Sequence, residues 1–275
     1  MKFRVEGQIA RSKVQRESAA EGTPSESQSE QYSLAKILGV WAAAALPMAA
    51  LAWIVAPLVA GQLDGPVALA RALLVSLTLG LIWQFVLVVL LVHRERGSVR
   101  WSVLKDALWL HSPRSPKTGR VGGRLWLVLI PFVLLFAAEG AIPILSVIPP
   151  VSSHDFAVFL ESAAGREFFS GNWVFYAVEV VLVVFNTILG EELLFRGLLL
   201  PRMKGAFGRW DWAANGFLFA LYHLHMPWVI PETLLIDTFA MAYPSRRYRS
   251  ALIGIIVHTI PSVVVLALLL FIVLK

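Results

Sequence analysis

The sequence predicts an all-α protein, a polytopic transmembrane helix bundle of about seven spans, with eight as the alternative count. Hydrophobic residues make up 57% of the chain and charged residues 15%, a balance that soluble domains do not use. The apolar residues also come in long blocks rather than in alternating patterns. Blocks of this length can cross about 30 Å of hydrocarbon at ~1.5 Å per residue.

Three blocks contain no charged residue, namely 37–63, 72–92 and 250–274. Two further blocks are interrupted only by a few ionisable groups: 124–150 by Glu139, and 172–200 by Glu179 and a cluster of two acids and an arginine. Two more spans are predicted between 200 and 250. Residues 213–231 are uncharged but end in prolines, and residues 228–244, which carry Glu232 and Asp237, are the weakest of the seven.

The distribution of lysine and arginine predicts the orientation of the chain. With a cytoplasmic N-terminus, 20 of the 24 basic residues fall in the tail or in loops on the cytoplasmic side, as the positive-inside rule requires. The sixth span is needed to keep Arg246, Arg247 and Arg249 on that side. We therefore expect a multi-pass protein of the plasma membrane, with the N-terminus cytoplasmic and the C-terminus outside.

The chain divides into a tail and a membrane domain. Residues 1–33 are polar and rich in Ser, Glu and Gln, so we expect a disordered cytoplasmic tail, and residues 34–275 form the transmembrane domain. Two stretches, 101–110 and 156–163, have the apolar stripe of helices that lie on the membrane surface. The basic residues behind the net charge of +6 lie mainly on the predicted cytoplasmic side, so we expect membrane lipids and no nucleic acid as partners. Nothing in the chain indicates the oligomeric state.

Ionisable groups within the apolar blocks point to an active site. Glu191, Glu192 and Arg196 lie in the fourth span, His223 in the fifth and His258 in the seventh. At ~1.5 Å per residue all of them lie roughly 10–15 Å from the cytoplasmic end of their helices. Because charged groups at that depth cost several kcal/mol each, they need partners or a task.

The spacing suggests different roles for the two acids. Glu192 and Arg196 stand at i and i+4 on a helix, so their side chains can meet. Glu191 points elsewhere and remains available as a general base that deprotonates water, with His223 sharing that work. We interpret His225, two residues further on and about 200° round an ideal helix, as structural or interfacial.

His258 and Ser262 are also at i and i+4 and can offer hydrogen-bond donors to a tetrahedral oxyanion. Asn186 is interpreted as a contact between helices. Glu139, Glu179 and Asp237 are expected either to line the cavity or to pair with its residues, and the sequence does not place them.

Three motifs resemble the CAAX prenyl protease and bacteriocin-processing (CPBP) family of intramembrane glutamic endopeptidases. They are Glu-Glu-x-x-x-Arg at 191–196, Phe-x-x-x-His at 219–223 and His-x-x-x-Ser at 258–262, and the resemblance covers about 173–274. It implies an all-helical endopeptidase in which Glu191 and His223 activate water, His258 belongs to the oxyanion hole, and the substrate is a prenylated tail, a peptide leader or a membrane protein. The family usually has Asn at the last motif position, where this chain has Ser262.

Two other interpretations use the same groups. The chain lacks the His-Glu-x-x-His zinc signature and has no cysteine, so no cofactor is expected; a divalent metal such as zinc, held by Glu191, His223 and His258, is the alternative. A non-catalytic membrane scaffold or a proton-coupled carrier would use the buried polar groups as contacts or as a relay. The serine at 262 favours the scaffold.

Overall fold

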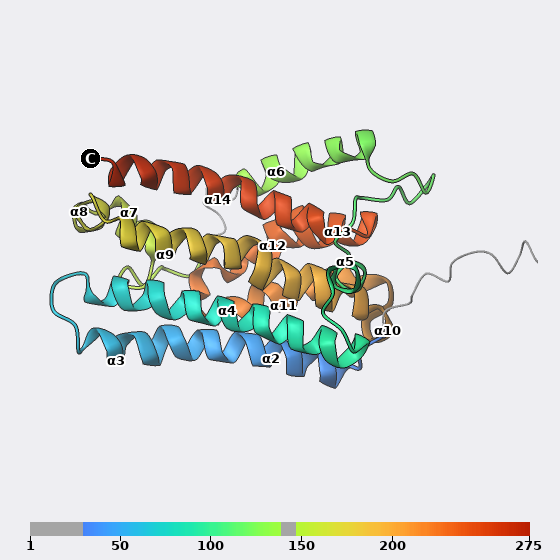
Figure 1. The fold of residues 1–275 in the computed structure, drawn as a ribbon, viewed down its shortest axis with the longest axis horizontal. Helices are drawn as coiled ribbons and strands as arrows, with labels where there is room; N and C mark the ends of the chain where they lie inside the picture. The colour runs from blue at the N-terminus through green and yellow to red at the C-terminus, as the bar shows by residue number, and fades with distance from the viewer. Residues whose placement is uncertain (1–29, 139–146) are drawn as a thin grey trace, which may run out of the picture. The chain divides into compact units, whose positions relative to one another are not determined.

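The computed structural model describes residues 30–138 and 147–275 of the chain. Within them the backbone is helical, and extended pairing is limited to one isolated bridge between Arg114 and Val121. The all-α class predicted from composition is therefore confirmed (Figure 1). Glu139 and residues 1–29 of the predicted tail lie outside the described residues, and the membrane unit spans Gln31–Lys275.

Four helices in the described part of the chain are long and apolar enough to cross a membrane, with lengths of 27, 29, 30 and 23 residues. Each covers one predicted apolar block, so a multi-pass membrane protein is confirmed. In chain order they are α2 (Leu34–Ala50) continued by η1 (Leu51–Val55) and α3 (Ala56–Ala60); α4 (Ala68–Arg96); α9 (Trp173–Val184) continued by η5 (Phe185–Gly190), η6 (Leu193–Leu199) and η7 (Leu200–Arg202); and α14 (Ala251–Val273).

The other three predicted spans are built from shorter pieces, so a count of seven stays a prediction. Block 124–150 is covered by η2 (Gly123–Val128) and α6 (Leu129–Ala137) up to residue 138. The two proline-bearing blocks contain α11 (Asp211–Tyr222), η9 (His223–His225), η10 (Pro227–Val229), α12 (Ile230–Asp237), η11 (Thr238–Ala242) and α13 (Tyr243–Tyr248). Pro227 and Pro231 stand in the first turn of η10 and of α12, where the missing N–H is tolerated, so each proline marks the start of a short helix.

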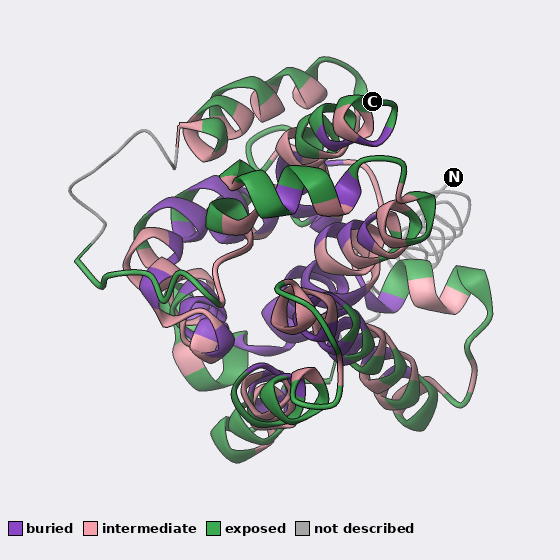
Figure 2. Cartoon of the chain, turned by 90° about the vertical axis from the view of Figure 1, so that its left-hand side faces the viewer, coloured by how far each residue is buried: buried purple, intermediate pink, exposed green. Residues whose placement is uncertain are grey.

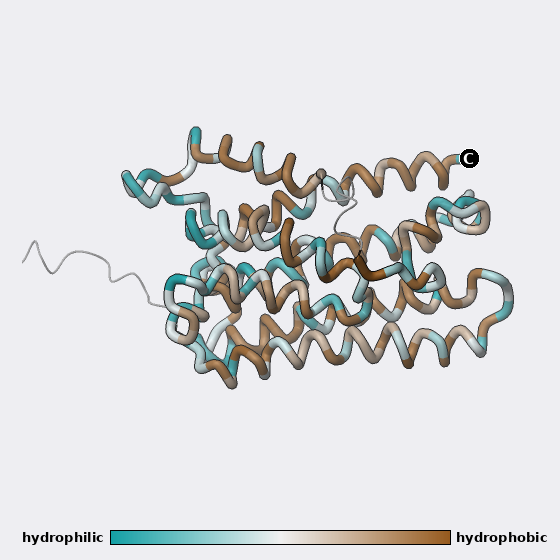
Figure 3. The backbone as a smooth tube through the Cα atoms, turned by 180° about the vertical axis from the view of Figure 1, so that it is seen from behind, coloured by the Kyte–Doolittle hydropathy of each residue, from teal (hydrophilic) through white to brown (hydrophobic). Residues whose placement is uncertain are grey.

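The connections gather at the two ends of the long helices (Figure 1). The α3–α4 connection, α7 (Phe156–Glu161), α8 (Ala163–Phe169) and the C-terminus lie at one end. At the other end lie α5 (Trp101–Ala107), α10 (Lys204–Phe207), η8 (Gly208–Trp210) and α13. Apolar residues follow the middle of the long helices and polar ones their ends (Figure 3). This arrangement puts the loops that carry most arginines at one end, as the predicted topology requires.

The two predicted surface helices are present but are shorter than expected. The first ends at Ala107, and Leu108 beyond it is 1% exposed while Trp101 is 68% exposed, so the predicted stripe does not lie on one surface. The second breaks at Ser162, whose hydroxyl accepts the N–H of Gly165 at 2.9 Å and so starts α8.

A buried ion pair fixes the end of the bundle that carries the basic loops. Arg202 donates from Nη2 and Nε to Glu95 Oε2 at 2.9 and 3.0 Å, and from Nη1 to the carbonyl oxygens of Ala107 and Leu198. The Tyr32 hydroxyl bonds the other oxygen of Glu95. Because these hydrogen bonds satisfy nearly every donor of the Arg202 guanidinium, they offset the cost of burying the ion pair. The Tyr32 contact also shows that the chain joins the bundle just before α2.

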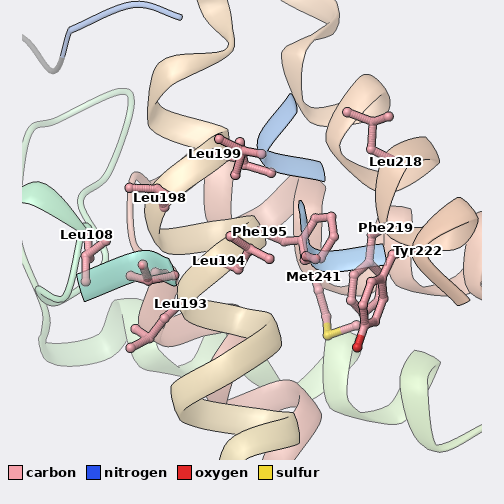
Figure 4. Close-up of a cluster of buried hydrophobic side chains, with 14 of the residues drawn as sticks. Leu108, Leu193, Leu194, Phe195, Leu198, Leu199, Leu218, Phe219, Tyr222 and Met241 are labelled. Carbon is pink, nitrogen blue, oxygen red and sulfur yellow. The ribbon is translucent and has the colours of Figure 1, made fainter. Parts of the chain in front are cut away.

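The core surrounds the helix segment that carries the two acids. Buried residues concentrate between the helices, and exposed ones face outward (Figure 2). Figure 4 shows Phe195 of η6 pointing toward α11, whereas Leu193 and Leu198 point toward Leu108 on the other side. The ring of Phe195 lies 4.9 Å from that of Phe219 and 5.5 Å from that of Tyr222, with Met241 beside them. Aromatic packing of this kind holds η6 against α11, the helix that leads to His223.

Candidate active site

The Glu191–Glu192 pair lies between two π-helical stretches, η5 and η6. Such wide turns are rare and occur often at functional sites. Gly190 permits the close packing here, because a Cβ at this position would lie 3.0 Å from the carbonyl oxygen of Leu81 on α4. The helix around both acids therefore departs from the ideal geometry on which their predicted directions rest.

Glu192 is held between two basic side chains. Its Oε2 lies 3.4 Å from Arg196 Nε, which is the i, i+4 contact expected from the sequence, and both side chains are fully buried. Its Oε1 lies 3.2 Å from Nδ1 of His258 on α14. Gly254 of α14 faces the pair, since a Cβ there would overlap Glu192 Oε2 and lie 3.1 Å from Arg196 Cγ. Glu192 thus joins two transmembrane helices.

Glu191 contacts neutral side chains instead. In the amide orientation that satisfies its hydrogen bonds, the Asn186 nitrogen donates to Glu191 Oε1 at 2.7 Å and to Oε2 at 3.2 Å. The Tyr222 hydroxyl is a further hydrogen-bond partner of Glu191 and accepts from Gln84 Nε2 at 2.7 Å. Glu191 is 2% exposed, so these donors take the place of water around its carboxylate.

The Phe-x-x-x-His motif packs against the Glu-Glu-x-x-x-Arg motif through Phe219. The guanidinium of Arg196 lies 3.9 Å from the centre of the Phe219 ring, a cation–π contact for a side chain whose nitrogens otherwise have no hydrogen-bond partner among the described residues. His223 places Nδ1 2.9 Å from the Phe219 carbonyl oxygen. Because that nitrogen then carries the proton, Nε2 of His223 is left with its lone pair.

His225 lies beside His223, which corrects the expectation that it faces the far side of a helix. The rings stack with centroids 5.4 Å apart and an angle of 24° between their planes. The reason is that α11 ends at Tyr222 and a 3₁₀ turn follows, so the angle of an α-helix does not apply. His225 is 4% exposed, and its Nδ1 has no hydrogen-bond partner among the described residues.

A cavity of about 260 Å³ reaches Glu191 but not Glu192. Its polar lining comes from four parts of the bundle and its walls are apolar. The polar side chains from the helices are Glu179, Asn186, Glu191, His225 and Ser262, Ser153, His154 and Asp155 add to them from a loop, and the walls include Leu74, Leu77, Leu81, Leu182 and Val265. The cavity is therefore mainly apolar with a few polar groups, which is typical of a binding site.

The cavity extends to the 153–159 segment at the end of the bundle opposite the arginine-rich loops. His154 of this segment stacks on Trp53 of η1, with ring centroids 4.4 Å apart and an interplanar angle of 20°. Burial lowers the pKa of His154, so the ring is neutral at pH 7. The segment thus forms an aromatic wall at the far end of the cavity.

Ser262 lies at the cavity, but its hydroxyl is already engaged. It donates to the carbonyl oxygen of His258 at 3.0 Å, one turn earlier in α14. His258 itself has its Nε2 3.5 Å from the Asn186 amide and its ring 5.4 Å from that of Phe136. Of the two expected oxyanion donors, the serine therefore has to leave a backbone partner before it can serve.

Several polar residues around Glu191 were not identified from the sequence. Asn186, interpreted as a contact between helices, does contact His258 of α14 and is in addition a hydrogen-bond partner of Glu191; Tyr222 and Gln84 form the second chain of donors. Glu179 lines the cavity with its Oε2 unpartnered among the described groups. Polar residues inside apolar spans were the available signal, but their partners depend on how the helices pack.

The residues considered as metal ligands do not converge. Among the described residues, no group of three or more His, Cys, Asp or Glu side chains is arranged to hold a metal ion. Glu191, His223 and His258 thus do not fit a three-ligand zinc site in this arrangement, and no step below depends on a metal.

Comparison with known proteins bears on the same part of the chain. Neither the search of curated proteins nor the search of solved structures found a match to the chain. The Rce1-like family, described as type II CAAX prenyl endopeptidase Rce1-like, matches residues 173–264, which hold all three motifs. The resemblance to the CPBP proteases is thereby confirmed, and the segment that carries the three motifs is similar to Rce1-like type II CAAX prenyl endopeptidases.

Proposed function

We propose that the protein is an intramembrane endopeptidase in which Glu191 activates water to hydrolyse a peptide bond of a membrane-associated or prenylated substrate. One observation carries the assignment. Of the two adjacent acids, Glu191 lines the cavity, whereas Glu192 is engaged by Arg196 and His258. A general base must reach the proton it removes, and of these two acids Glu191 is the one at the cavity, where a water can bind.

In the proposed reaction, the Glu191 carboxylate takes a proton from water while the water oxygen attacks the carbonyl carbon of the scissile bond. The tetrahedral intermediate collapses when the C–N bond breaks, and the proton held by Glu191 passes to the leaving amine. Nε2 of His223, which is free to accept, can hold the water or guide the proton. No cofactor is required by this scheme.

The developing oxyanion needs donors, and two candidates lie near Glu191. Asn186 lines the cavity and, in the amide orientation that satisfies its hydrogen bonds, turns its nitrogen toward Glu191; Nε2 of His258, outside the cavity lining, lies 3.5 Å from the same side-chain amide. Glu192 fixes the His258 ring through Nδ1. We propose Asn186 as a donor that complements His258 where the family asparagine is replaced by Ser262.

The cavity walls indicate the kind of substrate. Leucine and valine side chains dominate the lining, so an apolar peptide segment or a prenyl group fits better than a polar peptide. The extension toward 153–159 gives such a segment room beyond Glu191. We expect the protein to act from within the plasma membrane on substrates that are themselves anchored there.

The test is cleavage by the purified full-length protein of a library of membrane peptides, each synthesised with and without a C-terminal prenyl group. Glu191→Gln should abolish cleavage, and Glu167→Gln, the same change at an exposed acid on α8, should leave the rate unchanged. A chelator should not alter the rate. Wild-type turnover by Glu191→Gln would refute the glutamate mechanism.

The non-catalytic scaffold remains the second candidate because of Ser262. Its hydroxyl is bound to the His258 carbonyl, so the last motif position supplies no free donor in this arrangement. A scaffold would bind membrane partners with no cleavage of any peptide in the library, and its binding would survive Glu191→Gln.

A further inference from the structure

A second cavity, of about 580 Å³, lies at the arginine-rich end of the bundle, away from Glu191. It is formed by the loop before α6, the start of α11 and the helix α13. Its charged lining residues are Arg114, Arg209, Asp211, Arg246, Arg247 and Arg249. Five arginines against one acid make this lining strongly positive.

The single acid of the lining does not neutralise it. Asp211 is 1% exposed and pairs with Arg246, whose Nε lies 2.5 Å from its Oδ2. This ion pair ties the start of α11 to α13 and holds one arginine in place. The side chains of Arg209 and Arg247 are exposed at the cavity, where they can turn toward an anion.

The backbone that presents these arginines is fixed by hydrogen bonds. Arg114 N donates to the carbonyl oxygen of Tyr248 at 2.9 Å, which ties the loop to the end of α13. Gly122 N donates to the carbonyl oxygen of Pro113 at 2.9 Å and closes the loop. Arg249 has a φ of 49°, a left-handed conformation that a residue other than glycine rarely adopts and that often marks a functional position. The arginines thus converge on one cavity instead of being scattered along loops.

Aromatic side chains border the same cavity. Trp212 and Tyr243 both line it, with ring centroids 5.3 Å apart, and Trp212 contacts Phe239, which is 49% exposed. Tryptophan and tyrosine prefer the level of lipid headgroups at the edge of a bilayer. A ligand that fits here carries a phosphate for the arginines and an apolar part for the aromatic border.

We propose that this cavity binds the phosphate of an acidic phospholipid headgroup. Arginine is well suited to the task because its planar guanidinium binds phosphate oxygens in pairs. Basic pockets between transmembrane helices on the cytoplasmic side bind acidic headgroups in this way, and the predicted topology puts this end of the bundle in the cytoplasm. The inference does not depend on the proposed protease activity.

The test measures binding to the purified full-length protein in a neutral detergent, using short-chain phosphatidylglycerol, short-chain phosphatidylcholine and inorganic phosphate as separate probes. We expect phosphatidylglycerol to bind at least about tenfold more tightly than either of the others. The double variant Arg209→Gln/Arg247→Gln should weaken its binding about tenfold or more, at about fivefold for each arginine.

The matched control is Arg94→Gln/Arg100→Gln, which removes the same charge from exposed residues outside the cavity lining. It should change the affinity less than twofold. An equal loss in both double variants would show diffuse attraction to a basic surface, and inorganic phosphate binding as tightly as the lipid would show a site for a free anion. Either result overturns the proposal. Because all four arginines are exposed, loss of the fold is not expected, and size-exclusion chromatography checks it.

Discussion

Nδ1 of His258 lies 3.2 Å from Oε1 of Glu192, and this contact joins the last transmembrane helix to the helix that carries both acids. Arg196 approaches the other oxygen of the same carboxylate. Both oxygens of Glu192 are therefore committed to the packing of two helices, while the adjacent Glu191 faces the cavity. Two neighbouring glutamates consequently have different environments, and their substitution should have different effects.

Exchange of each acid for glutamine should separate the two roles. Glu191→Gln should lower the cleavage rate below detection with an unchanged melting temperature, because glutamine keeps the shape but cannot accept the proton. Glu192→Gln should cost roughly 3 kcal/mol or more of stability, because it leaves Arg196 buried without its partner. Thermal unfolding in detergent and peptide cleavage measure the two effects. Equal loss of stability in both variants would contradict this division.

Gly254→Ala should destabilise the protein by about 1–3 kcal/mol, because the new methyl group would overlap Glu192 Oε2 and crowd Arg196. The control is Gly39→Ala in α2, where nothing lies within 4 Å of the added carbon. It should be neutral or stabilise by up to ~1 kcal/mol, as alanine does inside a helix. If both variants melt at the wild-type temperature, the close approach of α14 to Glu192 is wrong.

The two stacked histidines should respond differently. His223→Gln should slow cleavage about 100-fold or more, since it removes the nitrogen that accepts a proton near the water. His225→Phe keeps an aromatic ring in the stack and should stay within about tenfold of the wild-type rate. Initial rates at equal folded amounts distinguish the two. The reverse order would assign the proton transfer to His225, which lines the cavity.

Ser262 can be tested with asparagine and alanine. Ser262→Asn should keep or raise the cleavage rate, because an asparagine amide can donate a hydrogen bond to the oxyanion. The serine hydroxyl instead donates its hydrogen to the His258 carbonyl oxygen. Ser262→Ala should slow turnover by less than the ~10²–10³ typical of a lost oxyanion donor, because the hydroxyl is already engaged. Identical behaviour of all three proteins in a cleavage assay would favour the scaffold.

The predicted topology can be mapped with introduced cysteines, because the chain has none of its own. Cysteines at the exposed positions Thr118 and Lys204 should be protected from an impermeant thiol reagent in intact cells, whereas those at Gln62 and Ser153 should be labelled. Labelling after permeabilisation serves as the control for accessibility. Labelling of the first pair in intact cells would invert the orientation.

The sequence determined the class of the protein because composition and block length are local properties. Four long apolar blocks, three of them free of charged residues, became long helices, and the i, i+4 spacing brought Glu192 and Arg196 together. The three motifs also sufficed for the resemblance that the match at 173–264 confirms. Where proline, Glu232 and Asp237 interrupted the apolar pattern, the same reasoning predicted continuous spans, but the structure has shorter helices there.

Only the tertiary structure decided which polar groups meet around Glu191. The π-helical turns on both sides of the two acids and the 3₁₀ turn after Tyr222 change the direction of the side chains that follow, so angles counted on an ideal helix placed His225 on the wrong side. The contacts of Asn186, Tyr222 and His258 depend on how close neighbouring helices approach. That distance is set by small residues such as Gly190 and Gly254 packing against another helix, a property of helix pairs that no single segment of sequence contains.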